Sequence, residues 1–213
     1  IVWFKRDLRI SDHKPIYQAS TSKIPLLPIY IVEPEYWEQP FANRRHWYFI
    51  NDCLIELRQD LKQLGQGLIV RVGSVVDIFK EFSEQYYIKN IYAHEETGNQ
   101  WTYNRDIEVQ KWCKNNNILL NEFPTNGVVR GLKNRSEWSK IRKTRIYDTL
   151  IKTPLSLTPL TGLEEGSIPE KYDAIFNLFT SFGYFEDDAD NYKTIKAIHN
   201  SLTETGFAVI DFM

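Results

Sequence analysis

Short apolar runs alternate with longer amphipathic stretches over the first 123 residues of the chain. The short runs are rich in β-branched and aromatic residues, which is typical of strands, and the stretches between them carry apolar side chains at helical spacing. The pattern predicts five strands: Ile1–Phe4, Leu26–Val32, Leu68–Val72, Asn90–Ala93 and Ile118–Phe123. Strands that alternate with helices indicate the α/β class, with a doubly wound, Rossmann-like parallel sheet of five strands.

The clearest predicted helix is Arg44–Leu64, where apolar residues recur every three or four positions and Gly65 supplies a stop. Two further helices are predicted over Ser74–Tyr86 and Gln100–Asn115. The helix after the first strand is expected to begin near Ser11, because serine is a favourable N-cap. These helices would join the strands by right-handed crossovers.

The charge pattern changes after the fifth predicted strand. Residues 130–145 hold seven basic side chains and one acid, and residues 164–190 hold eight acids and one lysine. We expect the basic stretch to be a solvated helix face or to contact the acidic stretch. Because aromatic residues lie within it, contact with a nucleic-acid backbone stays open. The domain itself is expected over residues 1–152, with an extended, proline-containing linker over residues 153–169.

Residues 170–213 are expected to be an incomplete segment. They predict one helix that includes Ile195, Ile198 and Leu202, a stop at Gly206, and a strand over Phe207–Phe212. One helix and one strand are too little for a domain. Together with the absence of an initial methionine, this favours the expectation of a piece of a longer protein, and the sequence leaves a natural short protein open.

Composition excludes several classes. An apolar content of 42% in 213 residues excludes a disordered chain, and two cysteines are too few for a disulfide framework or a cysteine-rich zinc site. No run of eighteen apolar residues occurs, so no membrane segment is expected. A net charge of −2 argues against a uniformly basic nucleic-acid binder. We expect a soluble, cytoplasmic protein.

The loops that follow the strands carry the candidate chemistry. In an open doubly wound sheet, ligands bind in a crevice at the carboxyl ends of the strands. The loop after the first strand places Lys5, Arg6 and Arg9 around Asp7, just before a helix N-terminus, which would attract a phosphate or carboxylate. The other possibility is that Asp7 and its basic neighbours form only a surface ion network.

The loop after the fourth strand begins with His94, Glu95 and Glu96 and ends with Gly98 and Asn99. Contiguous residues on a loop rarely converge on one ion, so no metal is expected, and a polar organic ligand or a solvated loop fits better. The sequence contains no G-x-G-x-x-G, no P-loop and no G-x-S-x-G motif, and no catalytic residue is predicted.

Six segments together resemble the photolyase/cryptochrome family. The opening Ile1–Asp12, IVWFKRDLRISD, is similar to the family signature W-F-[RK]-x-D-L-R-x-x-D. The resemblance continues in register and covers about residues 1–152. The later matching segments are Leu27–Pro34, Arg44–Arg45, Val70–Gly73, Tyr103–Val109 and Asn126–Arg130.

The resemblance implies the N-terminal α/β antenna domain of a blue-light flavoprotein, either a DNA photolyase or a cryptochrome. FAD would be held only by a separate helical domain, which is not recognisable here, so this chain alone is expected to be inactive in DNA repair, although the parent protein could bind DNA. The domain would bind a second, light-harvesting chromophore in the crevice. Its expected contacts are Arg6, Asp7, Arg9, Glu33, Arg44, Glu95, Glu96 and Asn99.

A flavin, deazaflavin or lumazine is expected rather than a folate. Folate-binding members of the family commonly carry Asn-Glu where this chain has Trp101-Thr102. Two other classes stay open. One is a doubly wound nucleotide-binding or sensing domain, and the other is a structural domain that associates through exposed aromatic residues such as Trp37 and Trp47. The sequence leaves the oligomeric state open.

Overall fold

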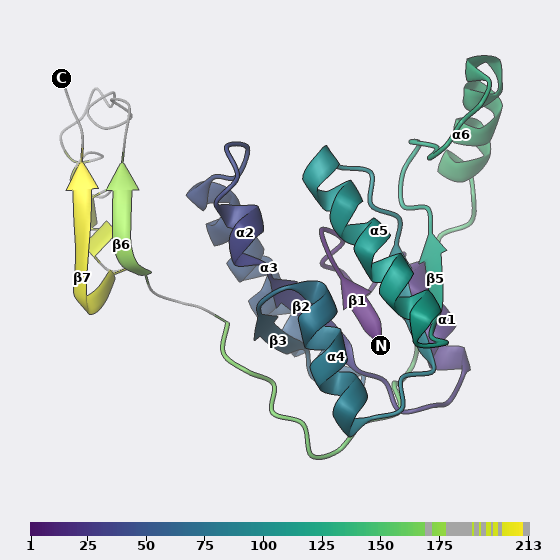
Figure 1. The fold of residues 1–213 in the computed structure, drawn as a ribbon, viewed down its shortest axis with the longest axis horizontal. Helices are drawn as coiled ribbons and strands as arrows, with labels where there is room; N and C mark the ends of the chain where they lie inside the picture. The colour runs from purple at the N-terminus through teal and green to yellow at the C-terminus, as the bar shows by residue number, and fades with distance from the viewer. Residues whose placement is uncertain are drawn as a thin grey trace. The chain divides into compact units, whose positions relative to one another are not determined.

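A parallel sheet of five strands forms the centre of the first 167 residues in the computed structural model (Figure 1). All five predicted strands are present, and the predicted α/β class is confirmed. The strands are β1 (Val2–Phe4), β2 (Pro28–Val32), β3 (Ile69–Val72), β4 (Asn90–His94) and β5 (Leu119–Phe123). Their order is β3-β2-β1-β4-β5. The chain therefore reverses direction across the sheet between β1 and β4, which is the switch point where such folds form a ligand crevice.

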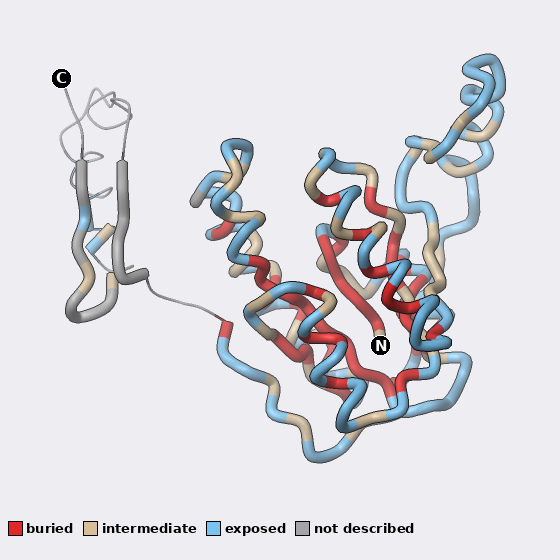
Figure 2. The backbone as a smooth tube through the Cα atoms, viewed as in Figure 1, coloured by how far each residue is buried: buried red, intermediate tan, exposed pale blue. Residues whose placement is uncertain are grey.

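Helices cover both faces of the sheet. Residues Val2, Trp3 and Phe4 of β1 are all buried, as is every residue of β2, which is typical of a parallel sheet between two helical layers. Trp3 belongs to a core cluster with Phe79 and Trp112 on the face covered by α4 and α5. Figure 2 shows that buried positions concentrate in the strands and on the inner sides of the helices. The helices around the sheet are α1 (Lys14–Thr21), α2 (Pro34–Trp37), α3 (Arg44–Gln63), α4 (Val75–Gln85) and α5 (Gln100–Asn115).

The first helix begins later than the sequence indicates. Asp12 has a φ of 48°, in the left-handed region, so a helix cannot run through it from Ser11. The N-cap is His13, whose ring accepts a hydrogen bond from the Ile16 amide. By contrast, α3 begins at its predicted residue, and both ends of α5 agree with the prediction.

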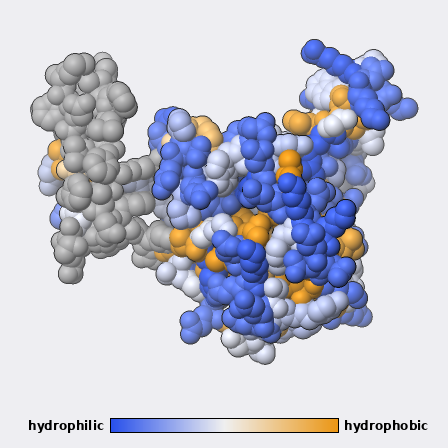
Figure 3. All heavy atoms as spheres, viewed as in Figure 1, coloured by the Kyte–Doolittle hydropathy of each residue, from blue (hydrophilic) through white to orange (hydrophobic). Residues whose placement is uncertain are grey.

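Two helical segments lie within residues 135–146, in the basic stretch for which the sequence predicts a solvated helix face without bounds. They are η1 (Arg135–Glu137) and α6 (Trp138–Ile146), and neither contains a buried residue. A helix that packs against no other element does not need an apolar face, so the sequence of this stretch shows no strong helical periodicity. Figure 3 shows mainly hydrophilic side chains over α6, in agreement with the expected solvated face.

The segment expected to be a linker packs against the sheet domain. Its backbone is extended, but the Leu157 amide donates to the Leu64 carbonyl at 2.7 Å and the Glu165 carbonyl accepts from the Val70 amide at 2.7 Å. The second bond pairs a backbone group of the edge strand β3, which would otherwise be unpaired, and the first joins the segment to the end of α3. The compact unit consequently ends at Ser167 rather than at residue 152.

The structure describes residues 1–168, 172–177, 189, 192, 195–196, 198–199 and 202–210. In the second unit, Ile168–Met213, β6 (Tyr172–Asn177) and β7 (Leu202–Ile210) form a parallel pair. Of the predicted helix, Ile195, Lys196, Ile198 and His199 are described and are helical. The predicted strand boundary is wrong, because β7 begins at Leu202 and continues through Gly206. The strand β6 was not predicted. The rest of this segment lies outside the described residues.

None of the helices in the described part of the chain is long and apolar enough to span a bilayer.

Candidate functional site

A cavity of about 510 Å³ lies at the carboxyl ends of β1 and β4. The switch point in the strand order falls between these two strands, so the cavity occupies the position that doubly wound folds use for ligands. Residues from the loop after β1, the loop after β4 and the segment 125–128 line it. Among the lining residues are Arg6, Asp7, Arg9, Glu95 and Glu96, all of which the sequence singled out as candidates.

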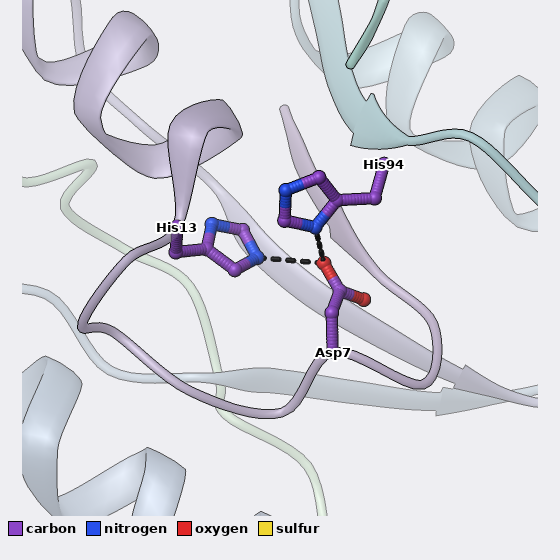
Figure 4. A group of neighbouring side chains, drawn as sticks. All are labelled: Asp7, His13 and His94. Atoms are coloured by element: carbon purple, nitrogen blue, oxygen red, sulfur yellow. Dashed lines mark hydrogen bonds and ion pairs between the residues drawn. The ribbon is translucent and has the colours of Figure 1, made fainter. Parts of the chain in front are cut away.

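Asp7, which lines this cavity, forms the centre of a buried cluster with His13 and His94 (Figure 4). Its Oδ2 lies 2.7 Å from His13 Nε2 and 2.5 Å from His94 Nδ1. Its Oδ1 accepts a hydrogen bond from the Lys5 amide at 3.0 Å. Burial by itself would raise the pKa of Asp7, but the hydrogen bonds with His13 and His94 outweigh it and hold the pKa well below its ordinary value. Asp7 is therefore an ionised carboxylate with its position fixed from both sides.

The cap on α1 decides which nitrogen of His13 carries the proton. Nδ1 accepts from the Ile16 amide at 3.2 Å, so in the neutral ring the proton is on Nε2 and is donated to Asp7. Burial lowers the pKa of His13 from its ordinary value, which favours that neutral ring. Asp7, His13 and His94 offer ligand atoms within 4.8 Å of one another. A metal at His13 Nε2 would move the proton to Nδ1 and break the cap, so the geometry favours a hydrogen-bonded cluster over a metal site.

A second buried network lies beside the first and consists of ion pairs. Lys5 Nζ is 2.7 Å from Asp106, and Arg105 reaches Glu33 at 2.6 Å, Asp106 at 2.8 Å and Glu96 at 3.3 Å. Burial alone would lower the pKa of Arg105, but Glu33 and Asp106 outweigh it and raise that pKa further above its ordinary value. This network holds the loop after β1, the loop after β2 and α5 together under the crevice.

Three of the predicted contact residues do not line the large cavity. Glu33 is engaged by Arg105, on the side of a much smaller cavity of about 40 Å³. Asn99 is the N-cap of α5, where its side-chain oxygen accepts a hydrogen bond from the Thr102 amide at 3.0 Å. Arg44 begins α3, and its side chain lies outside the described part of the structure.

The basic residues of the loop after β1 differ in how far their charges are neutralised. Lys5 pairs with Asp106, and Arg6 pairs with Glu96. Arg9 donates to the main-chain carbonyls of Ser11 and Asp12, each at 3.1 Å, and pairs with no acid among the described residues. Arg9 is therefore the cation in this loop that stays available to an anionic ligand.

The basic stretch after β5 supports the rim of the site. Arg130 Nη2 lies 2.8 Å from Glu122 and 3.6 Å from Glu95, and Arg145 lies 4.0 Å from Glu95. Glu95 Oε2 is the one buried side-chain oxygen or nitrogen without a hydrogen bond in the described part of the chain. Among the described residues, the acids that pair with the basic stretch are Glu95, in the loop after β4, and Glu122, in β5. None of these ion pairs is with the acidic stretch after residue 164.

Aromatic side chains pack together beside the small cavity, which Tyr36 and Trp37 line. Trp37 packs edge-on against Trp47 at 5.3 Å between ring centroids, and Tyr36 packs against Trp101 at 5.5 Å. Trp47 is buried. The expected exposure of Trp47 is therefore wrong, and the alternative of a structural domain that associates through exposed aromatic residues stays a prediction.

Sequence reasoning missed several residues of the site. His13 was hidden by the expected helix start at Ser11, two residues earlier. His94 lay in a segment that was singled out, but nothing local indicates that its ring turns back to Asp7. Thr97 and Asn126 also line the cavity and share a hydrogen bond of 2.9 Å, although 29 residues separate them.

The fold and the site together define a doubly wound α/β domain with a polar ligand cavity at its switch point. Residues 1–150 match the family model described as DNA photolyase. The chain belongs to the DNA photolyase family, which comprises the blue-light flavoproteins called photolyases and cryptochromes.

Curated relatives are similar over part of their length. Cryptochrome DASH, chloroplastic/mitochondrial, from Solanum lycopersicum is 30% identical over 122 residues, which cover 54% of this chain and 20% of that protein. Cryptochrome DASH from Gloeobacter violaceus is 26% identical over 190 residues, which cover 81% of this chain and 38% of that protein. The chain thus spans well under half the length of these relatives.

Solved structures share the fold. A bacterial class III photolyase from Agrobacterium tumefaciens has a TM-score of 0.67 at 17% identity, covering 78% of this chain and 36% of that one. An archaeal photolyase from Sulfolobus tokodaii has a TM-score of 0.60 at 20% identity, covering 73% of this chain and 37% of that one.

Proposed function

We propose that this domain binds a light-harvesting chromophore of the flavin, deazaflavin or lumazine type in the cavity between β1 and β4, as the antenna domain of a photolyase or cryptochrome. The observation that carries the proposal is the cavity of about 510 Å³ at the switch point of the sheet. Its volume is within the range of pockets that bind ligands of this size, roughly 300–1,000 Å³. Membership of a flavoprotein family supports a coloured ligand.

The charges around the cavity support a ligand that combines a polar ring with an anionic group. Arg9 has a guanidinium group that no acid among the described residues neutralises, and it suits a phosphate or carboxylate. His94, Thr97 and Asn126 offer hydrogen-bonding groups of the kind that bind ring carbonyls and ring nitrogens.

The type of chromophore is the finer part of the proposal. The Sulfolobus tokodaii photolyase is described with two FAD molecules and as implying a novel light-harvesting cofactor. By analogy, a flavin-type ring is a reasonable ligand here. Trp101 and Thr102, which stand where folate-binding members carry Asn-Glu, are in the first turn of α5 and do not line the large cavity. A folate is therefore the less favoured ligand.

In this proposal the domain itself performs no bond chemistry. FAD, and DNA if the whole protein is a photolyase, would be bound by another part of the protein, and the protein would work in the cytoplasm. The domain would absorb light through its chromophore and pass the energy on.

A binding experiment with the 213-residue chain tests the proposal. Purified protein is titrated with FMN, 8-hydroxy-5-deazaflavin, 6,7-dimethyl-8-ribityllumazine and methenyltetrahydrofolate, and absorption and fluorescence are recorded. We expect saturable binding of one of the first three, weakened about tenfold by Arg9→Gln when the ligand carries a phosphate. Lys111→Gln, which removes an exposed cation from α5, serves as the charge-matched control. Failure of all four ligands to bind would overturn the antenna function.

Adenine nucleotides complete the same experiment. A triphosphate needs several free cations or backbone amides. In the loop after β1, Lys5 and Arg6 are already paired with acids, and His13 occupies the Ile16 amide at the start of α1. We expect ATP and AMP to leave the melting temperature unchanged. Stabilisation by these nucleotides without stabilisation by flavins would favour the nucleotide-binding alternative.

A further inference from the structure

The two ring nitrogens of His94 are in different environments. Nδ1 lies 2.5 Å from Asp7 Oδ2, whereas Nε2 has no hydrogen-bond partner among the described residues. The side chain is only 5% exposed and lines the cavity. Glu95 Oε2 is the sole fully buried side-chain oxygen or nitrogen without a partner in the described part of the chain, so His94 Nε2 is not sealed off. We infer that Nε2 is the His94 atom that a ligand in this cavity would meet, because Nδ1 is engaged by Asp7.

The neighbouring cluster determines the protonation of each nitrogen. Asp7 is ionised, and a carboxylate can only accept hydrogen bonds. His94 must therefore present Nδ1 with its proton to Asp7, in the same way that His13 presents Nε2. In the neutral ring, this leaves a lone pair on His94 Nε2. With a neutral His94 ring, the site holds a positioned hydrogen-bond acceptor next to the cavity.

Hydrogen-bond donors line the same cavity. The Thr97 hydroxyl accepts from Asn126 Nδ2 at 2.9 Å, and no described residue accepts the proton of that hydroxyl. The Arg9 guanidinium is a further donor. One acceptor together with donors is complementary to a ring N–H that lies between two carbonyl groups. This is the pyrimidinedione edge that flavins, deazaflavins and lumazines share.

We propose that His94 Nε2 accepts a hydrogen bond from the imide N–H of a pyrimidinedione ring in the cavity, and that Asp7 and His13 are positioning residues that hold the acceptor in place. The inference rests on the proposed function and makes it more specific. It predicts that the ligand must carry this N–H, whatever the rest of its ring system.

The test compares a ring with and without that hydrogen. The probe is the ring that the chain binds most tightly among FMN, its 5-deaza form and 6,7-dimethyl-8-ribityllumazine, together with the derivative of that ring methylated at the imide nitrogen. Dissociation constants are measured by fluorescence titration for the wild type, His94→Ala, and the matched control His46→Ala, in which an exposed histidine of α3 is removed.

For the wild type and His46→Ala, we expect methylation of the imide nitrogen to weaken binding about tenfold. For His94→Ala, the unmethylated ring should bind about tenfold more weakly, and methylation should make little further difference because the smaller side chain leaves room for the methyl group. His94→Gln, which restores an acceptor oxygen, should recover part of the discrimination.

The outcomes separate the two proposals. If no ring binds at all, both the antenna function and the role of His94 are overturned. If a ring binds but the wild type tolerates imide methylation, or if His94→Ala still discriminates, the antenna function stands and the assignment to His94 fails. The wild-type comparison needs no substitution, so it decides the matter even if His94→Ala does not fold.

Discussion

Asp7 Oδ2 lies 2.7 Å from His13 Nε2, and this hydrogen bond joins the loop after β1 to the first turn of α1. The same histidine caps the helix through its other ring nitrogen. One side chain therefore fixes a helix start and a buried carboxylate together, and the position of His94 depends on that carboxylate in turn. Five predictions follow from this arrangement and its surroundings.

Removing His13 should be costly, whereas removing Ser11 should not. His13→Ala deletes an N-cap, which costs about 1 kcal/mol, and leaves a buried carboxylate short of a donor, which costs about 1–3 kcal/mol. We expect a loss of about 2–4 kcal/mol in the free energy of unfolding, measured by urea denaturation with tryptophan fluorescence. Ser11→Ala should stay within about 0.5 kcal/mol, and an equal loss for the two variants would place the helix start at Ser11 after all.

Stability should fall as the pH is lowered from 7 towards 5. Burial lowers the pKa of His13 in the folded protein from its ordinary 6.5, so the unfolded chain binds the extra proton first. The contribution of His13 to stability is complete above pH 6.5 and is lost as the pH falls through the folded pKa. His13→Asn, which keeps a capping side chain, should show a smaller slope of unfolding free energy against pH. An unchanged slope would mean that other groups dominate this range.

Divalent metals should not stabilise the protein. His13 uses one ring nitrogen as acceptor for the helix cap and the other as donor to Asp7, so no lone pair is free for a metal without breaking the cap. We expect the melting temperature to stay the same with equimolar Zn²⁺ and with EDTA. A rise of several degrees that disappears in His13→Asn would identify a metal site instead.

Replacing Arg105 should lower the free energy of unfolding far more than replacing Arg6, although both side chains pair with Glu96. Arg105→Ala leaves buried carboxylates without their cation and should cost about 3–5 kcal/mol in the free energy of unfolding. The Arg6 side chain is 58% exposed, so Arg6→Gln should cost less than about 1 kcal/mol. Urea denaturation of both variants checks the difference. Similar losses would show that the network does not act as a buried unit.

Two leucines of the segment after residue 152 test whether it belongs to the domain. Leu157 is 4% exposed and Leu155 is 99% exposed. Leu157→Ala should destabilise the protein by about 2–5 kcal/mol, as is usual for a buried leucine, and Leu155→Ala should have no measurable effect. The matched pair is compared by thermal and urea unfolding. Equal effects would indicate that this segment is the free linker that its prolines and glycines suggested.

Local patterns in the sequence were sufficient for most of the sheet domain. The helices Arg44–Gln63 and Val75–Gln85 carry apolar residues at helical spacing, and the strands correspond to short apolar runs rich in β-branched and aromatic residues. Where the pattern was weak, prediction failed. The start of α1 depends on the left-handed Asp12 and a capping histidine rather than on a serine, and the bounds of the exposed helix α6 could not be predicted because it buries no apolar face.

The sequence by itself determined the fold class, the family and the loops that surround the crevice, because these depend on periodicity and on short motifs. Only the tertiary structure decided which side chains meet there. His94 reaches Asp7 across 87 residues, and Arg105 reaches Glu33 across 72. Such pairings depend on the order of the strands and on which charges lose their water on folding, and neither is encoded in the spacing of neighbouring residues.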